Sequence, residues 1–439
     1  MVLKVRIDHR TISNNSSQNV VLTILYRSFP VKKPLLSLLA YTFVSCQAQA
    51  QGTGKSLPGT EPFDIAISEF IAKWNVPGAS LAVAKDGKLV LAKGYGISNK
   101  DTNAPVDENT MFRMGSINKT LTAVMVMQLV EQDRLKLDDK AMPYFAKLGI
   151  QPQSIEDPRV QDITVRQLLQ HTAGLDRNKS GDHFFQPRLR EVAKRQKTEP
   201  VTCQVIVKDA LETKLDFMPG ERFAYSNTGY CMLGKIIEAA TGNTYSDYAN
   251  QHVLQPVIGK NFLLGKSLAS MPSETQYFMH PGESNMPGAP GVSIWSVPTP
   301  YGSYSIENME ALGAWVATPT DVLKFFLAID GAKGQRLLSS NAFDTITAPP
   351  VLALAPRPNR YYGMGVNVYK DDRQFNWFHG GSQPGLEALA LRTSAGYSWV
   401  VALNSRAQSD KRSTFFSELD RALWNAAKSV KTWPQGDLF

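Results

Sequence analysis

Apolar residues recur with two different periods along the chain, and the two periods predict different elements. In residues 61–74 they fall three and four positions apart, which predicts an amphipathic helix. In residues 78–96 they alternate around Asp86-Gly87, which predicts a β-hairpin closed by a type I′ turn. Further alternating segments predict strands at 361–369, 375–381, 386–393 and 397–405, and a closing amphipathic helix is expected at about 410–428.

Helical patterns fill the middle of the chain, from Ser116 to about residue 250. One of these helices is expected to begin near Thr164 and to close at Gly174. Residues 272–304 are rich in Pro, Gly, Ser and Tyr and predict a long loop, which we expect to gate the substrate. Its aromatic side chains are expected to stack on acyl chains or sugars: Tyr277, Trp295, Tyr301 and Tyr304.

Strands at both ends with helices between them predict an α+β fold. We expect an antiparallel β-sheet flanked by N- and C-terminal helices, with an inserted, mostly helical lobe. The expected divisions are a linker at 51–60, one domain over 61–429 and a tail at 430–439. Within the domain, the sheet lobe is expected at about 61–115 and 310–429, and the helical lobe at about 116–309. A cleft between the lobes is the expected place for a functional site.

The first 50 residues have the pattern of a secretory leader. The basic pair Lys32-Lys33 precedes an apolar run, and the small residues that end at Ala50 offer a cleavage site. The segment before this pair is an unusual prefix, so we hypothesise that translation starts near Val31, which N-terminal sequencing of the precursor would decide. An alternative stays open, in which Cys46 is lipidated and attaches the protein to a membrane. Either interpretation predicts export to the periplasm or outside the cell.

The charge and the apolar runs do not indicate a nucleic-acid-binding protein or a membrane-spanning domain, and the cysteines leave two interpretations open. The net charge of +8 does not indicate nucleic-acid binding, because residues 1–50 carry +5 of it. No apolar run long enough for a membrane span follows residue 60. Beyond the leader, Cys203 and Cys231 are either buried small hydrophobes or the partners of one disulfide.

Ser116 and Lys119 form the only S-x-x-K pattern in the chain and carry the first candidate chemistry. If the apolar segment that starts here is a buried helix, the two side chains share one face. Burial lowers the affinity of a lysine for its proton, and a neutral amine beside a hydroxyl is a general base beside a nucleophile. The simpler interpretation is a serine that caps a helix and a solvated lysine one turn later.

The second candidate element is Tyr225-Ser226-Asn227, in a turn just before a predicted helix. A phenol can relay a proton to a leaving group, and an amide can orient a lysine or a substrate carbonyl. The Y-x-N pattern recurs at Tyr248, but that copy lies within an amphipathic segment, where the ring is expected to pack as an ordinary helix residue. We therefore expect Tyr225 to be the functional tyrosine.

The third candidate element is His379-Gly380-Gly381, at the end of a predicted strand. Glycines at a strand edge permit close approach of a ligand to the backbone. The N–H of the following Ser382 is expected to join the N–H of Ser116 in an oxyanion hole. The K-S-G sequence at 179–181 is superficially similar, but it lies outside any strand pattern, so we exclude it.

In this order, the three elements resemble the serine β-lactamase/penicillin-binding-protein-like superfamily. They are most similar to the branch of class C β-lactamases, D-Ala-D-Ala carboxypeptidases, D-aminopeptidases and related esterases. The resemblance covers roughly residues 62–428. It implies that Ser116 is the nucleophile, Lys119 its base and Tyr225 the proton shuttle. It also implies substrate-binding roles for Asn227, His379, Gly380, Gly381 and Ser382.

The sequence departs from this branch at the first position of the third motif, where a lysine usually helps to hold a substrate carboxylate. His379 is largely neutral near pH 7 unless its pKa is raised. We therefore predict a serine hydrolase that works through an acyl-enzyme on small ester, amide or D-peptide substrates. A β-lactamase or D-Ala-D-Ala carboxypeptidase is the alternative within the same chemistry, and a non-turnover penicillin-binding or sensor module is the alternative of another class. The sequence implies no metal, organic cofactor or nucleic-acid partner, and it leaves the oligomeric state open.

Overall fold

The computed structural model describes residues 52–259, 262–352 and 359–439, so the leader predicted for residues 1–50 lies outside the described residues. A large antiparallel sheet organises this part of the chain, in the order β1-β3-β2-β12-β11-β10-β9-β8, with β4 paired to β3. Its strands are β1 Thr53–Ser56, β2 Gly78–Lys85, β3 Lys88–Asn99, β4 Ala104–Pro105, β8 Arg360–Tyr362, β9 Asn367–Lys370, β10 Phe375–Gln383, β11 Leu386–Thr393 and β12 Tyr397–Leu403.

The two ends of the described chain meet in the centre of this sheet. Strand β2 pairs with β12, with Ala82 opposite Val400. The hairpin between β2 and β3 turns at Asp86 and Gly87, which have φ angles of 51° and 78°. Two positive φ angles in succession are the signature of a type I′ turn, as the sequence predicted.

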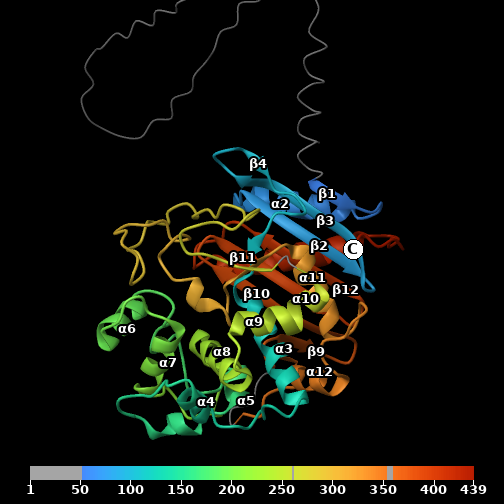
Figure 1. Ribbon diagram of the computed structural model, residues 1–439. Coiled ribbons are helices and arrows are strands. Elements are labelled where there is room, and N and C mark those ends of the chain that lie inside the picture. The colour runs from blue at the N-terminus through green and yellow to red at the C-terminus, as the bar shows by residue number, and fades with distance from the viewer. Residues whose placement is uncertain (1–51, 260–261, 353–358) are drawn as a thin grey trace, which may run out of the picture. The chain divides into compact units, whose positions relative to one another are not determined.

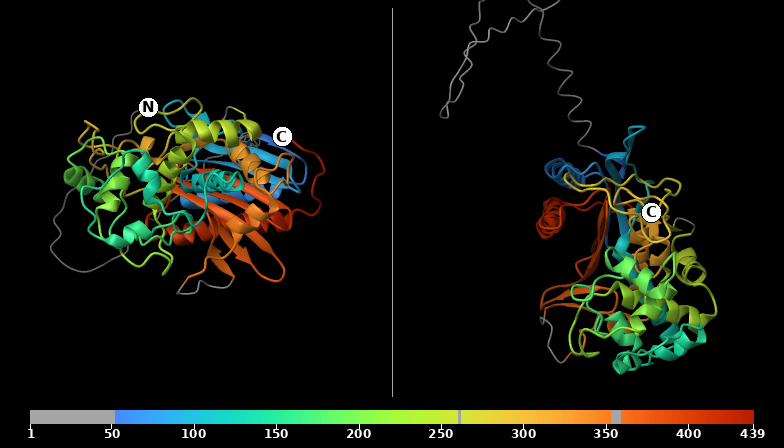
Figure 2. Two further views of the ribbon diagram at one scale, coloured as in Figure 1. Left: turned by 60° about the horizontal axis from the view of Figure 1, so that its bottom comes forward. Right: turned by 90° about the vertical axis from the view of Figure 1, so that its left-hand side faces the viewer.

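Helices cover both faces of the sheet (Figure 1). The N-terminal helix α2 (Glu61–Trp74) and the C-terminal helix α13 (Arg412–Ser429) pack against each other on one face, as the right-hand view of Figure 2 shows. Their apolar sides share one core with the sheet, to which the helices contribute Phe63, Ile67, Phe70, Phe415, Leu419 and Leu423. On the opposite face, α11 (Pro319–Ile329) packs against β2, β11 and β12. The predicted α+β architecture is therefore confirmed.

The inserted segment is mostly helical and surrounds α3 (Asn118–Glu131). Its other helices are α4 Met142–Lys147, α5 Val165–Leu169, α6 Arg188–Gln196, α7 Cys203–Leu211, α8 Asn227–Thr241, α9 Tyr245–Ala249 and α10 Gln255–Val257, and α12 Ser340–Thr347 follows α11. Short turns of tighter or wider helix are η1 Gly115–Ile117, η2 Pro158–Asp162, η3 Asn250–Leu254 and η4 Glu307–Met309. A small sheet of β5 Phe112–Arg113, β7 Trp315–Ala317 and β6 Leu263–Leu264 joins this segment to the large sheet.

The two cysteines left open by the sequence form a disulfide. Cys203 at the start of α7 is bonded to Cys231 in α8, which lies 28 residues further along the chain. The bond ties α7 to the helix that begins at Asn227, one of the predicted site residues. Within the described residues, no helix has the length and apolarity that a membrane span requires.

Two helix boundaries differ from the prediction. The helix capped by Thr164 ends at Leu169 instead of Gly174, because His171 adopts a left-handed conformation with φ of 58° and turns the chain. The helix expected to start at Ser116 starts at Asn118, after the tight turn η1. Ser116 is therefore not a capping residue, and no side-chain capping hydrogen bond is formed at the start of η1 or α3.

The aromatic residues of the loop at 272–304 do not have the positions that we expected for them. Tyr277, Tyr301 and Tyr304 enclose the side chain of Arg113, whose guanidinium lies 4.3 Å from the ring centre of Tyr277 and 5.5 Å from that of Tyr301. Trp295 is 84% exposed to solvent. The expectation of stacking on substrate was wrong for Tyr277, Tyr301 and Tyr304, because these three rings bury a cation, and it stays a prediction for Trp295.

Arg113 fastens this loop to strand β5. Its Nε atom lies 3.2 Å from Oε1 of Glu274, and both side chains are completely buried. Its terminal nitrogens donate to the backbone oxygens of Pro300 at 2.8 Å and Lys266 at 3.2 Å. The guanidinium thus joins two points of the loop, Glu274 and Pro300, and Lys266 ahead of the loop to the strand that leads into Ser116.

Replacing Glu274 tests how strongly this contact stabilises the fold. Glu274→Gln leaves a fully buried guanidinium without its compensating charge, and we expect a loss of about 3–5 kcal/mol in the free energy of unfolding. Guanidinium chloride denaturation measures it. Asp162→Asn is the matched control, because Asp162 pairs with Lys140 at 3.0 Å on the surface, where ion pairs contribute little. Equal changes in the two variants would contradict the structural importance of the Arg113 contact.

Candidate active site

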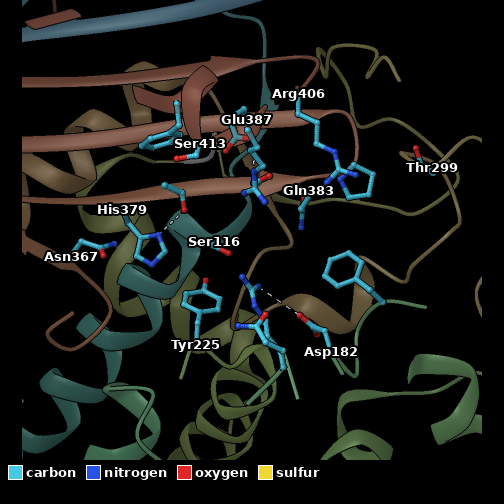
Figure 3. A pocket seen from close by; sticks show the side chains of 18 of the residues that line it. Ser116, Asp182, Tyr225, Thr299, Asn367, His379, Gln383, Glu387, Arg406 and Ser413 are labelled. Atoms are coloured by element: carbon cyan, nitrogen blue, oxygen red, sulfur yellow. Dashed lines mark hydrogen bonds and ion pairs between the residues drawn. The ribbon is translucent and has the colours of Figure 1, made fainter. Parts of the chain in front are cut away.

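Ser116 lies where the tight turn η1 passes the edge of strand β10. Gly115, the first residue of this turn, has a φ of 51°, a conformation that favours glycine. The preceding residue is held by the backbone, because the N–H of Met114 donates to the backbone oxygen of Trp315 at 3.0 Å. The Ser116 side chain is half-buried and lines a cavity of about 990 Å³. Figure 3 shows its side chain between those of Tyr225 and His379.

Lys119 is completely buried beneath Ser116, and its amine has three neighbours. The Nζ atom lies 2.7 Å from Oδ1 of Asn227, 3.1 Å from the backbone oxygen of Leu312 and 3.2 Å from Oγ of Ser116. The first two partners are carbonyl oxygens, which only accept hydrogen bonds, so they use both N–H groups of a neutral amine. The lone pair of that amine is left facing the hydroxyl of Ser116.

Two physical causes favour this neutral form of Lys119. Burial comes first, and the positive charge of Arg177 adds to it; together they hold the pKa of the amine well below its ordinary value of 10.5. The carboxylate of Asp182 acts in the opposite direction but does not outweigh them. Lys119 is thus suited to accept the proton of the Ser116 hydroxyl.

Tyr225 is in contact with the side chains of His171 and Arg177. Its ring lies 4.3 Å from the ring of His171 and 4.5 Å from the guanidinium of Arg177, measured between centres. Burial raises the pKa of the phenol, while a hydrogen bond with Ser116 and the charge of Arg177 partly offset the rise. The phenol is therefore protonated near neutral pH and can act as a proton donor beside Ser116.

Asn227 holds the amine of Lys119 instead of facing the cleft. Its Oδ1 accepts from Lys119, and its Nδ2 donates to Oδ2 of Asp182 at 2.7 Å. The carboxylate can only accept, so it fixes which end of the amide faces the lysine. The residue is buried, and it is not part of the wall of the cavity. The geometry thus makes Asn227 a positioning residue for Lys119, whereas the sequence predicted that it would also contact substrate.

The glycines of the third motif allow strand β10 to approach Ser116. A Cβ atom at Gly381 would lie 2.1 Å from the backbone oxygen of Met114, which no other residue type could tolerate here. One residue later, the backbone nitrogen of Ser382 lies 3.0 Å from the position of a Cβ on Gly115. The N–H of Ser382 is thereby brought beside the turn that carries the N–H of Ser116, the arrangement expected of an oxyanion hole. Gly380 lines the cavity next to the ring of Phe416.

His379 is neutral and is held by two hydrogen bonds. Its Nδ1–H donates to the backbone oxygen of Gly380 at 2.7 Å, so Nε2 accepts from the hydroxyl of Tyr362 at 3.0 Å. Burial, together with the nearby Lys119, lowers the pKa of His379 to about 3. A contact with a substrate anion, which would require a raised pKa, is not supported by this environment.

The two sequences that we excluded lie elsewhere in the fold. Tyr248 is completely buried in α9, where its ring stacks on His252 at 4.3 Å. Lys179 and Ser180 lie on an exposed loop near Asp216. Neither sequence contributes to the wall of the cavity.

Sequence reasoning missed several charged groups around the cavity. Asp182 and Arg177 come from one wall, and Glu283, Glu387, Arg360, Arg406 and Arg412 come from the remainder. Two of the arginines are paired, Arg406 with Glu283 at 3.4 Å and Arg412 with Glu387 at 3.2 Å. The run of polar residues after the H-T-A-G sequence at 171–174 was a visible signal for Arg177 and Asp182, but nothing local showed which of its residues face the site.

Part of the chain is similar in sequence to curated proteins from bacteria. The protein named flp from Staphylococcus aureus strain MW2 is 28% identical over 267 residues, which are 60% of this chain and 50% of that protein. The putative fimbrial assembly protein FimD of Dichelobacter nodosus is 34% identical over 173 residues, 39% of each chain. The matched region thus spans about half, or less, of the length of these relatives.

Two solved structures share the fold. The D-amino acid amidase from Ochrobactrum anthropi SV3 has a TM-score of 0.66 at 23% identity and covers 86% of this chain and 100% of its own. The octameric penicillin-binding protein homologue from Pyrococcus abyssi has a TM-score of 0.63 at 24% identity and covers 83% of this chain and 76% of its own. The model of the Beta-lactamase family matches residues 63–421. The chain therefore belongs to the beta-lactamase family.

Proposed function

We propose that the protein is a serine hydrolase that acts through an acyl-enzyme on ester or amide substrates, with Ser116 as its nucleophile. One observation carries the proposal: the completely buried amine of Lys119 lies 3.2 Å from Oγ of Ser116, and its other two partners are the carbonyl oxygens of Asn227 and Leu312. Membership of the beta-lactamase family and the fold shared with amidohydrolases support a hydrolase.

The residues suggest a balanced sequence of proton transfers. Lys119 takes the proton of Ser116 as its Oγ attacks the substrate carbonyl, and the N–H groups of Ser116 and Ser382 stabilise the oxyanion. The proton then passes through the phenol of Tyr225 to the departing oxygen or nitrogen, which leaves an ester on Ser116. A water molecule reverses these steps: its proton goes through Tyr225 to Lys119, its oxygen attacks the acyl carbon, and Ser116 recovers a proton as the acid departs.

Neutral His379 favours ester or amide substrates over those whose carboxylate must be held by a cation of the third motif. The third motif provides no fixed cation for such a carboxylate here. The similarity to a D-amino acid amidase is consistent with an amide substrate. Hydrolysis of p-nitrophenyl butyrate, nitrocefin and a D-Ala-D-Ala peptide, measured side by side, separates the three chemistries. A burst of product from p-nitrophenyl acetate without turnover would instead indicate a penicillin-binding or sensor module.

Replacement of the nucleophile is the first test. Ser116→Ala removes the attacking hydroxyl, so we expect hydrolysis to fall at least about 10³-fold and covalent labelling by a fluorophosphonate probe to disappear. Labelling of the purified protein, followed by peptide mass spectrometry, measures both the loss and the labelled position. A label that persists in Ser116→Ala would identify another serine as the nucleophile.

The phenol is tested by comparing two tyrosines. Tyr225→Phe removes the proton donor and should lower kcat by roughly 10²- to 10⁴-fold, as the loss of a general acid does. Tyr248→Phe is the matched control, because Tyr248 is buried in α9 away from the cavity and should leave kcat nearly unchanged. If Tyr248→Phe proves the more damaging change, the assignment of Tyr225 is wrong.

The proton affinity of Lys119 predicts a pH dependence. Its lowered pKa means that the amine loses its proton well below pH 10.5, so kcat/KM for a neutral ester should rise with pH and reach a plateau well below pH 10.5. Below the pKa the amine is protonated and the rate falls. A series of initial rates from acid to alkaline pH measures the profile. A rate that still rises above about pH 9 would mean that Lys119 is protonated at rest.

A further inference from the structure

Arg177 brings a positive charge into contact with a catalytic group. Its guanidinium lies 4.5 Å from the ring centre of Tyr225, and its side chain is 40% exposed and lines the cavity beside Ser116. Guanidinium groups stack favourably on aromatic faces, which leaves their N–H edges free to bind a ligand. Stacking on Tyr225 thus holds the guanidinium of Arg177 in place, and its N–H edge remains available to a ligand.

The hydrogen-bonding capacity of Arg177 is unused. No residue in the described ranges forms a hydrogen bond with its guanidinium, and its one ion-pair neighbour, Oδ2 of Asp182, is 3.9 Å away. That oxygen already accepts from Asn227 at 2.7 Å. By contrast, Arg406 and Arg412 are bonded to Glu283 and Glu387. Arg177 therefore combines a fixed position, a place in the cavity wall and N–H donors that have no hydrogen-bond partner among the described residues.

We propose that Arg177 forms an anion subsite that binds a carboxylate on the leaving-group part of the substrate. The inference rests on the proposed function, because it uses Tyr225 to define the two sides of the scissile bond. Tyr225 delivers the proton to the leaving atom, so a ligand group that contacts Arg177 on the face of that ring belongs to the leaving group. The planar fork of a guanidinium matches a carboxylate through two parallel hydrogen bonds.

The position of Arg177 also explains how the cavity can hold a carboxylate without a charged third motif. His379 is neutral and its ring nitrogens are engaged by Gly380 and Tyr362. Arg177 supplies its charge from the opposite, helical wall, in the loop that follows α5. The anion is thus bound next to the proton donor instead of along strand β10.

A pair of esters with matched leaving groups tests the subsite. We compare kcat/KM for 3-carboxyphenyl acetate and 3-carbamoylphenyl acetate, which differ in the charge of the leaving group and share the acyl group. In the native protein the anionic ester should be preferred. Arg177→Gln should lower the ratio of the two kcat/KM values by roughly tenfold to hundredfold, the usual effect of removing a charged hydrogen-bond partner, and Arg177→Lys should restore part of it. The ratio cancels any effect of Arg177 on Lys119 or Tyr225 that is common to both esters.

Two other arginines serve as controls. Arg222 pairs with Asp176 at 3.0 Å and lies 4.1 Å from the ring centre of Phe217, away from the cavity wall, so Arg222→Gln should leave the ratio unchanged. Arg360→Gln removes another cavity arginine, one for which the described residues provide no ion pair. A ratio that responds to Arg360→Gln and not to Arg177→Gln would overturn the proposal.

Direct binding separates failure of the subsite from failure of the proposed function. Calorimetric titration with 3-hydroxybenzoate, the anionic product, should show weaker binding to Arg177→Gln than to the native protein, and this holds even if neither ester is hydrolysed. Hydrolysis of both esters with equal kcat/KM, combined with equal binding of the product by the two proteins, would disprove the subsite while the serine hydrolase function stands. Product binding that depends on Arg177, without acylation of Ser116, would disprove the hydrolase and retain the subsite.

Discussion

The burial of one amine governs the arrangement of the whole site. A charged lysine removed from water without a strong partner costs several kcal/mol, whereas a neutral amine with satisfied hydrogen bonds costs far less. Lys119 is completely buried and has carbonyl oxygens from two separate segments as partners, the side chain of Asn227 and the backbone of Leu312. The segments that carry Asn227 and Leu312 must lie against α3, because without their carbonyl oxygens the buried amine would lack these hydrogen-bond partners. In the proposed mechanism, the same contacts that make the lysine compatible with the core also suit it to act as a base.

The two walls of the cavity divide the chemistry between them. The helical side carries the proposed acid–base groups, Lys119 and Tyr225. Asn227 lies at the N-terminus of α8, which is capped by Ser226, and this position places its side chain against the amine of Lys119. The sheet wall contributes backbone, because Gly381 allows β10 to come within contact distance of the Ser116 turn. A backbone N–H on a strand is held by the sheet and needs no reorganisation as charge develops on a substrate oxygen.

Local patterns in the sequence account for most of the elements and for the central residues of the site. Apolar alternation predicted the hairpin at Asp86-Gly87, and the spacing of Ser116 and Lys119 predicted their proximity, because both depend on residues close together in the chain. The contacts that escaped prediction join distant residues. Asp182 fixes the amide of Asn227 across 45 residues, and Glu274 neutralises Arg113 across 161. The composition of the 272–304 loop showed that aromatic rings were present, but it could not show that they enclose an arginine.

The charge distribution around Lys119 links its role as a base to the selection of a substrate. A fixed cation near the amine disfavours the protonated lysine, and Arg177 is the largest such contribution after burial. The guanidinium lies on the ring of Tyr225, so it also stabilises negative charge that develops on the phenol during proton transfer. A cation at the position of His379 would have a different environment from that of Arg177. The His379 side chain is buried and hydrogen-bonded to Tyr362, whereas the Arg177 side chain is 40% exposed. In the proposed mechanism, a cation on the helical wall favours the neutral form of Lys119 and lies beside Tyr225, and the proposed subsite uses the same charge to bind an anionic substrate where Tyr225 releases its proton.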